Sequence, residues 1–243
     1  MTDSKYLKRT IHKEQLESRF LNESRNLRVY LPPGYHEVVS YPVVYCQDGE
    51  EFFNFGRIAT IANQLILDDL TEPFIVIGVE VDTSVRTEEY APFGSRFEAY
   101  TRCFAEEIIP FIEQKYPVRQ DPGQRVLAGD SLGGCVSLHL AMNYPQMFHR
   151  IISLSGAYYT DTQEIVAESD DLSWLDIYMI VGLQETHFES DLGVYNFVEI
   201  NRSMKELLLD RGATVRYTEK DGKHIWGFWQ KELPDALLYF LRA

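Results

Sequence analysis

Short segments of this sequence are apolar at consecutive positions instead of alternate ones, as in PFIVIGVEV at 73–81. A strand has this pattern when side chains on both of its faces are buried, which is typical of a parallel sheet covered by helices. From such runs, and from the turn residues that bound them, we predict strands at 26–32, 41–47, 73–81, 125–129, 150–156, 176–182 and 214–220.

Segments with helical character lie between or after the later strands, at 102–116, 135–145, 196–212 and 231–243. Strands that alternate with helices favour a mostly parallel sheet with helices on both faces. No repeat, low-complexity tract or linker divides the 243 residues, and a chain of this length can bury one complete core. We therefore predict a single α/β domain that spans residues 1–243.

The composition is that of a globular protein, with 45% hydrophobic and 25% charged residues. The amino-terminal segment is charged throughout, and no apolar run reaches the roughly 18 residues that a membrane span requires. We therefore expect a soluble, cytoplasmic protein. A formal net charge of −14 at pH 7 repels nucleic acids and anionic membranes, so we expect neither as a partner.

The three cysteines, Cys46, Cys103 and Cys135, are an odd number and show no C-x-x-C spacing. This pattern indicates neither a disulfide framework nor a thiolate zinc site. We expect buried free thiols, and the sequence predicts no metal and no cofactor.

The segment RVLAGDSLGGCVSLHLA at 125–141 places small residues around one serine, where a predicted strand meets a predicted helix. A strand that ends at Gly129, a turn with Ser131 at its tip and a helix from about Gly134 form the arrangement called a nucleophile elbow. The strained turn brings strand and helix so close together that glycine is needed on either side of the serine. The alternative is an ordinary turn in which Ser131 caps the helix. We expect Asp130 to be a surface or turn residue.

A serine hydroxyl needs a base to take its proton, so this hypothesis requires a histidine and an orienting carboxylate later in the chain. His224 lies in KDGKHIWGFW, a glycine-containing loop after the last predicted strand, and is the candidate base. The aromatic residues that follow it can pack the loop or cover the core. Four other histidines are expected at surface or packing positions, namely His12, His36, His139 and His149.

The candidate acid is Glu185, which follows Gly182 by three residues at the carboxyl end of a predicted strand. Asp191 in the same loop is the alternative acid. The loop sequence ETHFESD also contains His187, so a metal site formed by His187 and carboxylates is a second interpretation of this loop. A solvated acidic loop is the simpler interpretation, and we adopt it.

Two backbone N–H groups are candidates for stabilising a developing oxyanion. The N–H of Leu132 follows the serine at the amino terminus of a helix. The N–H of Glu50 follows a predicted strand end at Asp48-Gly49, where glycine lets the chain turn sharply. A plain Asp-Gly turn is the alternative at this position.

Residues 86–102 combine arginines with aromatic residues, between the third predicted strand and the helix before the elbow. We name Arg86 and Tyr90 from this segment, and Trp226 from the loop after the last strand, as candidate substrate-binding residues. A surface loop packed on its own aromatic residues fits the segment equally well, and lid movement stays open.

Motifs spaced along the chain occur in the order of the putative esterase family: VVYCQDGEEFF, RTEEYAP, EEIIPFIEQKYPV, RVLAGDSLGG, YPQMFHRIISLSGAY, VGLQE and DGKHIWGFW. The chain from 25 to 240 is similar to this family, which resembles enterochelin esterase catalytic domains, feruloyl esterase modules and S-formylglutathione hydrolases. The resemblance implies an α/β-hydrolase fold, with Ser131 as nucleophile, His224 as base and an oxyanion hole near Glu50 and Leu132. The acid is often aspartate in such relatives, whereas a glutamate stands at the candidate position here.

The function that these motifs and the resemblance imply is hydrolysis of a small-molecule ester or thioester through an acyl-enzyme intermediate. Three alternatives stay open: acyl transfer to an alcohol, hydrolysis of a siderophore trilactone, and a non-catalytic binding module. A ferric catecholate ester is strongly anionic, so an acidic protein would attract it only if Arg86, Arg96 and Arg102 gather at the mouth of the site. The expected partner is the small-molecule ester, and the sequence leaves a homo-oligomer open.

Overall fold

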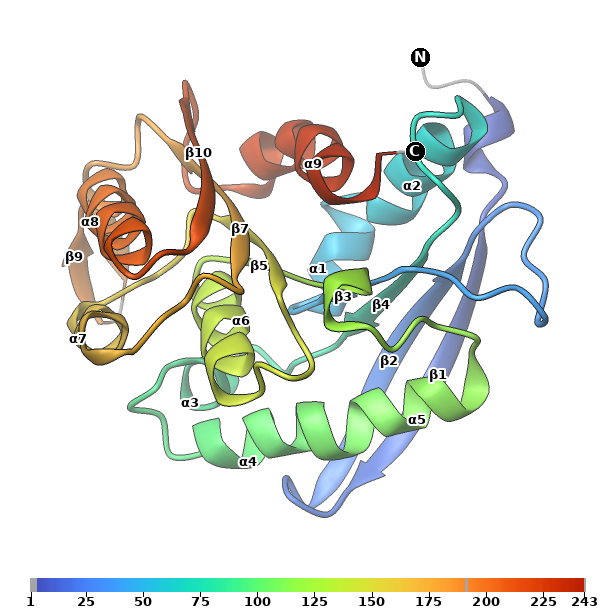
Figure 1. Ribbon diagram of the computed structural model, residues 1–243, viewed down its shortest axis with the longest axis horizontal. Coiled ribbons are helices and arrows are strands. Elements are labelled where there is room, and N and C mark those ends of the chain that lie inside the picture. The colour runs from blue at the N-terminus through green and yellow to red at the C-terminus, as the bar shows by residue number, and fades with distance from the viewer. Residues whose placement is uncertain (1–3, 191, 243) are drawn as a thin grey trace.

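The computed structural model describes residues 4–190 and 192–242, and its main feature is an eight-stranded sheet (Figure 1). The strands of this sheet are β1 (Thr10–Ser18), β2 (Glu23–Leu31), β3 (Val43–Cys46), β4 (Ile75–Val79), β5 (Arg125–Asp130), β6 (Arg150–Leu154), β7 (Asp176–Gly182) and β10 (Thr214–Lys220). Their order is β1-β2-β4-β3-β5-β6-β7-β10. A separate two-stranded hairpin consists of β8 (Phe188–Ser190) and β9 (Gly193–Tyr195).

The sheet is parallel from β4 to β10, and β2 is antiparallel to both of its neighbours. This confirms the predicted mostly parallel sheet, and each predicted strand overlaps one strand of it. Strands β3, β4 and β5 are buried at every position, as the consecutive apolar pattern requires. The sequence analysis did not predict β1, whose residues are mostly exposed at the edge of the sheet.

The helices are α1 (Gly49–Asn54), α2 (Ile58–Leu67), α3 (Arg86–Tyr90), α4 (Phe97–Arg102), α5 (Ile109–Lys115), α6 (Leu132–Asn143), α7 (Thr160–Glu168), α8 (Phe197–Asp210) and α9 (Trp226–Leu241). A π-helical segment, Cys103–Ile108, joins α4 to α5, and 3-10 turns lie at Ser4–Leu7 and Pro122–Gln124. All four predicted helices are present. However, α9 begins at Trp226, so residues expected in the loop after His224 form its first turn.

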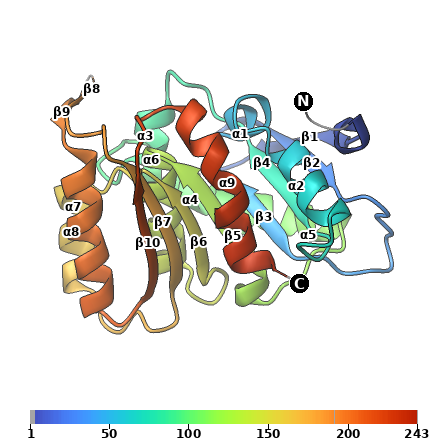
Figure 2. The same ribbon diagram turned by 90° about the horizontal axis from the view of Figure 1, so that it is seen from above.

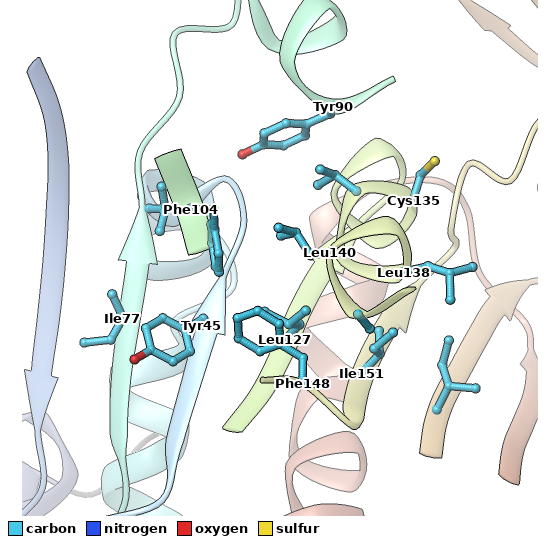
Figure 3. Close-up of a cluster of buried hydrophobic side chains, with 14 of the residues drawn as sticks. Tyr45, Ile77, Tyr90, Phe104, Leu127, Cys135, Leu138, Leu140, Phe148 and Ile151 are labelled. Carbon is cyan, nitrogen blue, oxygen red and sulfur yellow. The ribbon is translucent and has the colours of Figure 1, made fainter. Parts of the chain in front are cut away.

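Helices cover both faces of the main sheet (Figure 2). On one face, α1, α2 and α9 bury a cluster that includes Phe52, Ile58 and Leu237. On the other face, α6, α8 and the helical segment at 97–115 bury a larger cluster, part of which Figure 3 shows around Leu127. Because β5, β7 and β10 are parallel, the loops that follow them all lie at the carboxyl ends of the strands. Proteins with α/β folds bind their ligands at this end of the sheet.

All three cysteines are buried and free, as predicted. Burial raises the pKa of the Cys135 thiol to about 12, so this thiol stays protonated near neutral pH. Within residues 4–190 and 192–242, none of the helices has the length and apolar character needed to cross a membrane.

Candidate active site

Ser131 lies in the sharp turn between β5 and α6, with φ 53° and ψ −120°. A positive φ is uncommon for a residue with a side chain and stores strain. The Ser131 N–H donates to the Leu154 carbonyl at 2.9 Å, and the Ala157 N–H donates to the Ser131 carbonyl at 2.9 Å. The Ser131 side chain makes no capping hydrogen bond to α6, so this turn is not held by an ordinary capping serine.

Gly129 allows the strand and the helix of this turn to approach closely. A Cβ atom at Gly129 would overlap the carbonyl group of Gly133 and lie 2.6 Å from the Gly134 nitrogen. These neighbours are backbone atoms in a packed interior, so they cannot move aside as a flexible side chain could. The crowding predicted around the serine is therefore present.

His224 and Glu185 form a buried hydrogen-bonded pair. His224 Nδ1 lies 2.6 Å from Glu185 Oε2, and the exposed fractions of the two side chains are 7% and 0%. The Gly182 N–H and the Ser155 hydroxyl donate to the other carboxylate oxygen at 2.7 and 2.8 Å. Because a carboxylate only accepts hydrogen bonds, Nδ1 carries the proton of this contact, and in the neutral imidazole the lone pair is on Nε2.

Three aromatic rings surround the His224 imidazole. The ring centroids of Phe197, Phe188 and Trp229 lie 4.1, 4.4 and 4.9 Å from that of His224. Trp229 Nε1–H also donates to the Ser155 hydroxyl at 2.8 Å. The imidazole is therefore held in one orientation. Sequence reasoning anticipated packing by the aromatic residues after His224 but gave no signal for Phe188 and Phe197, which begin β8 and α8.

The structure brings the predicted nucleophile, acid and base to the carboxyl ends of the parallel strands. Ser131, Glu185 and His224 follow β5, β7 and β10, whose carboxyl ends point the same way. Ser155 follows the intervening strand β6 and donates its N–H to the Ile180 carbonyl at 2.7 Å. A continuous set of backbone and side-chain contacts therefore links the serine turn to the buried pair.

The loop after β3 carries the second predicted oxyanion donor. The left-handed residue of this loop is Asp48, with φ 52° and ψ 48°, and not Gly49 as the expected glycine turn implied. Gly49 is needed for a different reason, because a Cβ atom there would overlap the backbone of Gly78 in β4. Glu50 and Leu132 lie in the first turns of α1 and α6. N–H groups at these positions have no acceptor within the helix, so they are available to an oxyanion.

Arg86 and Tyr90, two candidate substrate-binding residues, contact this loop directly. Arg86 Nε and Nη2 donate to the two Asp48 carboxylate oxygens at 2.6 and 2.8 Å, and Nη2 also donates to the Asp130 carbonyl at 3.2 Å. Tyr90 is completely buried, and its hydroxyl accepts a hydrogen bond from the Asp48 N–H at 3.0 Å. Both side chains therefore hold the loop after β3 in place through hydrogen bonds with Asp48.

Asp130 is buried, which corrects the expectation of a surface or turn residue. It is the last residue of β5, and only 4% of it is exposed. Burial and the neighbouring Asp48 carboxylate raise the pKa of Asp130 well above its ordinary value, while Arg86 opposes this shift. Among the residues described, nothing donates to or accepts from its buried Oδ1 atom.

The other arginines of the 86–102 segment are ion-paired. Arg96 Nη2 lies 2.9 Å from a Glu23 oxygen and 3.0 Å from a Glu89 oxygen. Arg102 Nε lies 3.1 Å from a Glu106 oxygen on the next helical turn. With Arg86 bound to Asp48, all three arginines considered for attracting an anion are neutralised by carboxylates of the chain itself.

Trp226, the third candidate substrate-binding residue, connects α9 to α1. Its Nε1–H donates to Glu51 Oε2 at 2.7 Å, and its ring lies edge-on to Phe52 at a centroid distance of 4.8 Å. Because Trp226 follows His224 by two residues, it links the segment that carries the base to the helix that carries the Glu50 N–H.

Residues 18–240 match the model of the family described as Putative esterase. The chain belongs to this family. A relative from Bacillus subtilis (strain 168), Uncharacterized protein YjcH, is 38% identical over 230 residues, which cover 94% of this chain and 96% of the relative. Membership assigns the chain to the carboxylic-ester hydrolases.

Two solved structures share the fold of this esterase. A ferulic acid esterase superimposes with a TM-score of 0.81 at 19% identity, covering 96% of this chain and 98% of that chain. The enterobactin esterase of Shigella flexneri, solved in the presence of enterobactin, has a TM-score of 0.81 at 20% identity and covers 95% of this chain and 58% of that chain. These similarities confirm the predicted α/β-hydrolase fold.

A cavity of about 290 Å³ opens beside the loop after β3. It is lined by Asp48, Glu50, Glu51, Asn54, Phe55, Val81 and Thr83. Phe55 is 58% exposed and supplies an apolar surface among the acidic side chains. The cavity therefore offers space for part of a substrate next to the Glu50 N–H, and sequence reasoning identified only Glu50 among its lining residues.

The segment after β7 contains the remaining predicted residues, His187 and Asp191. His187 Nε2 lies 3.4 Å from Glu189 Oε1, and the two side chains are 70% and 77% exposed. In the part of the chain that the structure describes, no group of three or more His, Cys, Asp or Glu side chains is arranged to hold a metal ion. Asp191, the alternative acid, lies outside the described residues.

Proposed function

We propose that this chain is a serine esterase that hydrolyses a small-molecule ester or thioester through an acyl-enzyme intermediate. Ser131 is the nucleophile, His224 is the general base, and Glu185 orients the imidazole. The observation that carries the proposal is the buried contact of 2.6 Å between His224 Nδ1 and Glu185 Oε2, which leaves Nε2 to accept a proton. The strained, uncapped Ser131 at the same edge of the sheet supports its role as nucleophile.

In the first step, Ser131 Oγ forms a bond to the carbonyl carbon of the ester, and His224 Nε2 takes the hydroxyl proton. Glu185 stabilises the imidazolium cation that results. The N–H groups of Leu132 and Glu50 stabilise the negative charge that develops on the carbonyl oxygen. The bond between the carbonyl carbon and the alcohol oxygen then breaks, the imidazolium returns its proton to the leaving alcohol, and Ser131 remains acylated.

In the second step, the oxygen of a water molecule forms a bond to the carbonyl carbon of the acyl group on Ser131, and His224 takes a proton from that water. The acyl bond to Ser131 breaks, the serine oxygen regains the proton, and the carboxylic acid leaves. Acyl transfer would use the same residues with an alcohol in place of water. Product analysis in the presence of an added alcohol separates the two reactions, because a transferase forms a new ester.

The charges around the site argue against a ferric catecholate as substrate. Arg86, Arg96 and Arg102 are all paired with carboxylates of the chain. The cavity beside the loop after β3 is lined by Asp48, Glu50 and Glu51. Asp48 is paired with Arg86 and Glu50 with Arg28, whereas Glu51 forms no ion pair among the described residues. An anionic siderophore would therefore meet an uncompensated carboxylate there, which disfavours its binding. We therefore propose a neutral or cationic ester.

The first test is hydrolysis of p-nitrophenyl acetate and p-nitrophenyl butyrate by the wild type and by Ser131→Ala and His224→Ala. Both variants should lose almost all turnover while circular dichroism shows that they remain folded. Ser169→Ala and His36→Ala are matched controls, because both positions lie on segments other than those that carry Ser131, Glu185 and His224, and both variants should keep wild-type rates. Wild-type turnover by either Ser131→Ala or His224→Ala would contradict the assignment.

A fluorophosphonate label tests the nucleophile without any assumption about the substrate. The serine oxygen should displace fluoride and form a phosphonyl adduct, which intact-protein mass spectrometry detects as one added group. Peptide mapping should place the adduct on Ser131, and Ser131→Ala should remain unlabelled. Equal labelling of wild type and Ser131→Ala would show that another residue reacts.

A further inference from the structure

A cavity of about 530 Å³ lies between the edge strand β10 and the carboxyl-terminal half of α9, and the proposed function does not use it. Arg216 and Lys220 line it from β10, Tyr178 from β7, and Asp235 and Tyr239 from α9. Figure 2 shows α9 crossing one face of the sheet, with β10 to one side of it. The side chains of Arg216 and Lys220 lie on the same face of β10 because their positions differ by an even number.

The lining of this cavity is basic, although the whole chain has a net charge of −14. Arg216, Lys220 and Arg242 line it together with a single carboxylate, Asp235. Lys220 is neutralised, because its Nζ contacts Glu232 and lies 3.2 Å from an Asp235 oxygen. The other two cations have no such partner: over residues 4–190 and 192–242, Arg216 and Arg242 form neither an ion pair nor a side-chain hydrogen bond.

Two tyrosine rings form an aromatic wall in the same cavity. The ring centroids of Tyr178 and Tyr239 are 5.8 Å apart, and their planes are inclined by 51°. The Tyr239 hydroxyl donates to Asp176 Oδ1 at 2.9 Å, so its polar end is already satisfied. An aromatic ring held in this way offers its apolar surface to a flat group.

The end of the cavity that holds Arg216, Tyr239 and Arg242 is distant from the proposed catalytic residues, whereas Lys220 lines the other end four residues before His224. Helix α9 begins at Trp226, two residues after His224, and Tyr239 lies near its other end. A helix rises about 1.5 Å per residue, which separates Tyr239 from Trp226 by roughly 20 Å along the axis. A small molecule bound at this end would not reach His224.

We propose that this cavity is a second binding site, for a small organic anion in which a phosphate or carboxylate group is attached to a flat ring. Arg216 and Arg242 bind the anionic group, because a guanidinium presents paired donors that match phosphate and carboxylate oxygens. The ring packs mainly against Tyr239, which is 37% exposed, because Tyr178 is only 4% exposed. The site is independent of the ester reaction, so binding can be measured without turnover.

Isothermal titration calorimetry on the wild-type chain tests this site with phenyl phosphate and phthalate, neither of which is a carboxylic ester. We expect saturable binding of one molecule per chain, for phenyl phosphate if the natural ligand is a phosphate and for phthalate if it is a carboxylate. Arg216→Gln and Arg242→Gln should each weaken binding about tenfold or more, because a charge-assisted hydrogen bond is lost. The control Arg202→Gln removes an exposed arginine of α8 that is paired with Glu219, and should bind normally.

Three results would overturn the proposal. The first is the absence of saturable binding of both probes at millimolar concentrations. The second is equal weakening in Arg202→Gln, which would mean that the probes respond only to the overall charge. The third is equally tight binding of inorganic phosphate and phenyl phosphate, which would mean that the ring contributes nothing to binding through Tyr178 and Tyr239.

Discussion

Arg86 binds Asp48 through two nitrogens, Nε and Nη2, at 2.6 and 2.8 Å, and the same Nη2 reaches the carbonyl of Asp130 at 3.2 Å. One side chain of α3 therefore joins the loop after β3 to the residue before Ser131. Burial opposes the guanidinium charge, but Asp48 and Asp130 more than offset it and raise the pKa of Arg86 above its ordinary value. Arg86 therefore holds the loop after β3 against the serine turn.

Replacement of Arg86 should lower kcat more than it raises KM. Arg86→Gln removes the two-nitrogen contact with Asp48, and a small displacement of the Glu50 N–H costs roughly ten- to a hundredfold in kcat. Arg86→Lys should lie between this variant and the wild type, because lysine keeps the charge but not the planar pair of donors. Steady-state kinetics with p-nitrophenyl butyrate measure both parameters.

The control for this prediction is Arg102→Gln, which removes an exposed ion pair with Glu106 and should leave both parameters unchanged. Circular dichroism and urea unfolding check that each variant is folded, since Asp48 loses a buried partner in Arg86→Gln. A rise in KM at constant kcat would instead make Arg86 a residue that contacts the substrate.

Glu185→Gln should keep the shape of the buried pair and lose its function. A glutamine can present its amide N–H to Nδ1, which favours the wrong imidazole tautomer and removes the charge that stabilises the imidazolium. We expect kcat to fall by about 10²–10⁴-fold with little change in KM. Glu189→Gln on the same loop is the control, because its side chain is 77% exposed. Near-normal turnover by Glu185→Gln would contradict the role of Glu185 and favour Asp191, the alternative acid.

The strands and the serine turn could be predicted from local sequence because their physical causes are local. A strand buried on both faces must be apolar at consecutive positions, and Gly129 is required by the close approach of backbone only four residues away at Gly133. The strand β1 was missed because its exposed residues show no such run. Its position depends on pairing with β2, which a pattern of polar residues does not reveal.

The surroundings of the site were less predictable because they depend on residues far apart in the chain. Asp130 looks like a turn residue beside glycines, yet its environment is determined by Asp48, from the loop after β3, and by Arg86, from α3. Likewise Phe188 and Phe197 pack on His224 only because β8 and the start of α8 lie beside it in the folded chain. Local sequence spacing predicts the candidate catalytic residues, whereas tertiary packing determines which residues surround them.

Gly129→Ala should destabilise the fold, because its Cβ atom would overlap the backbone of α6. We expect a loss of roughly 2–4 kcal/mol in the free energy of unfolding, as for overpacked interiors with rigid neighbours. Gly227→Ala is the matched control: its Cβ would meet no atom closer than 3.7 Å, and alanine within a helix should add about 0.5–1 kcal/mol. Urea unfolding measures both. Equal stability of Gly129→Ala and the wild type would mean that β5 and α6 leave enough space for a methyl group at this position.

His139 should make the stability of the fold depend on pH between about 4 and 6.5. The side chain lies in α6, only 4% of the residue is exposed, and its Nε2 lies 3.0 Å from Thr162 Oγ1. Burial lowers the pKa of His139 from 6.5 to about 4. Between these values the unfolded chain binds a proton that the native protein does not, so the free energy of unfolding falls as the pH falls.

The shift in the pKa of His139 corresponds to a loss of roughly 3 kcal/mol across this range. His139→Gln carries no titrating group, so urea unfolding between pH 7 and pH 4 should show a shallower decrease in stability than the wild type. His187→Gln, which removes a largely exposed histidine, should keep the wild-type slope. If His139→Gln and the wild type lost stability in parallel, acid sensitivity would have to come from other groups, and His139 would titrate in the native protein much as it does in the unfolded chain.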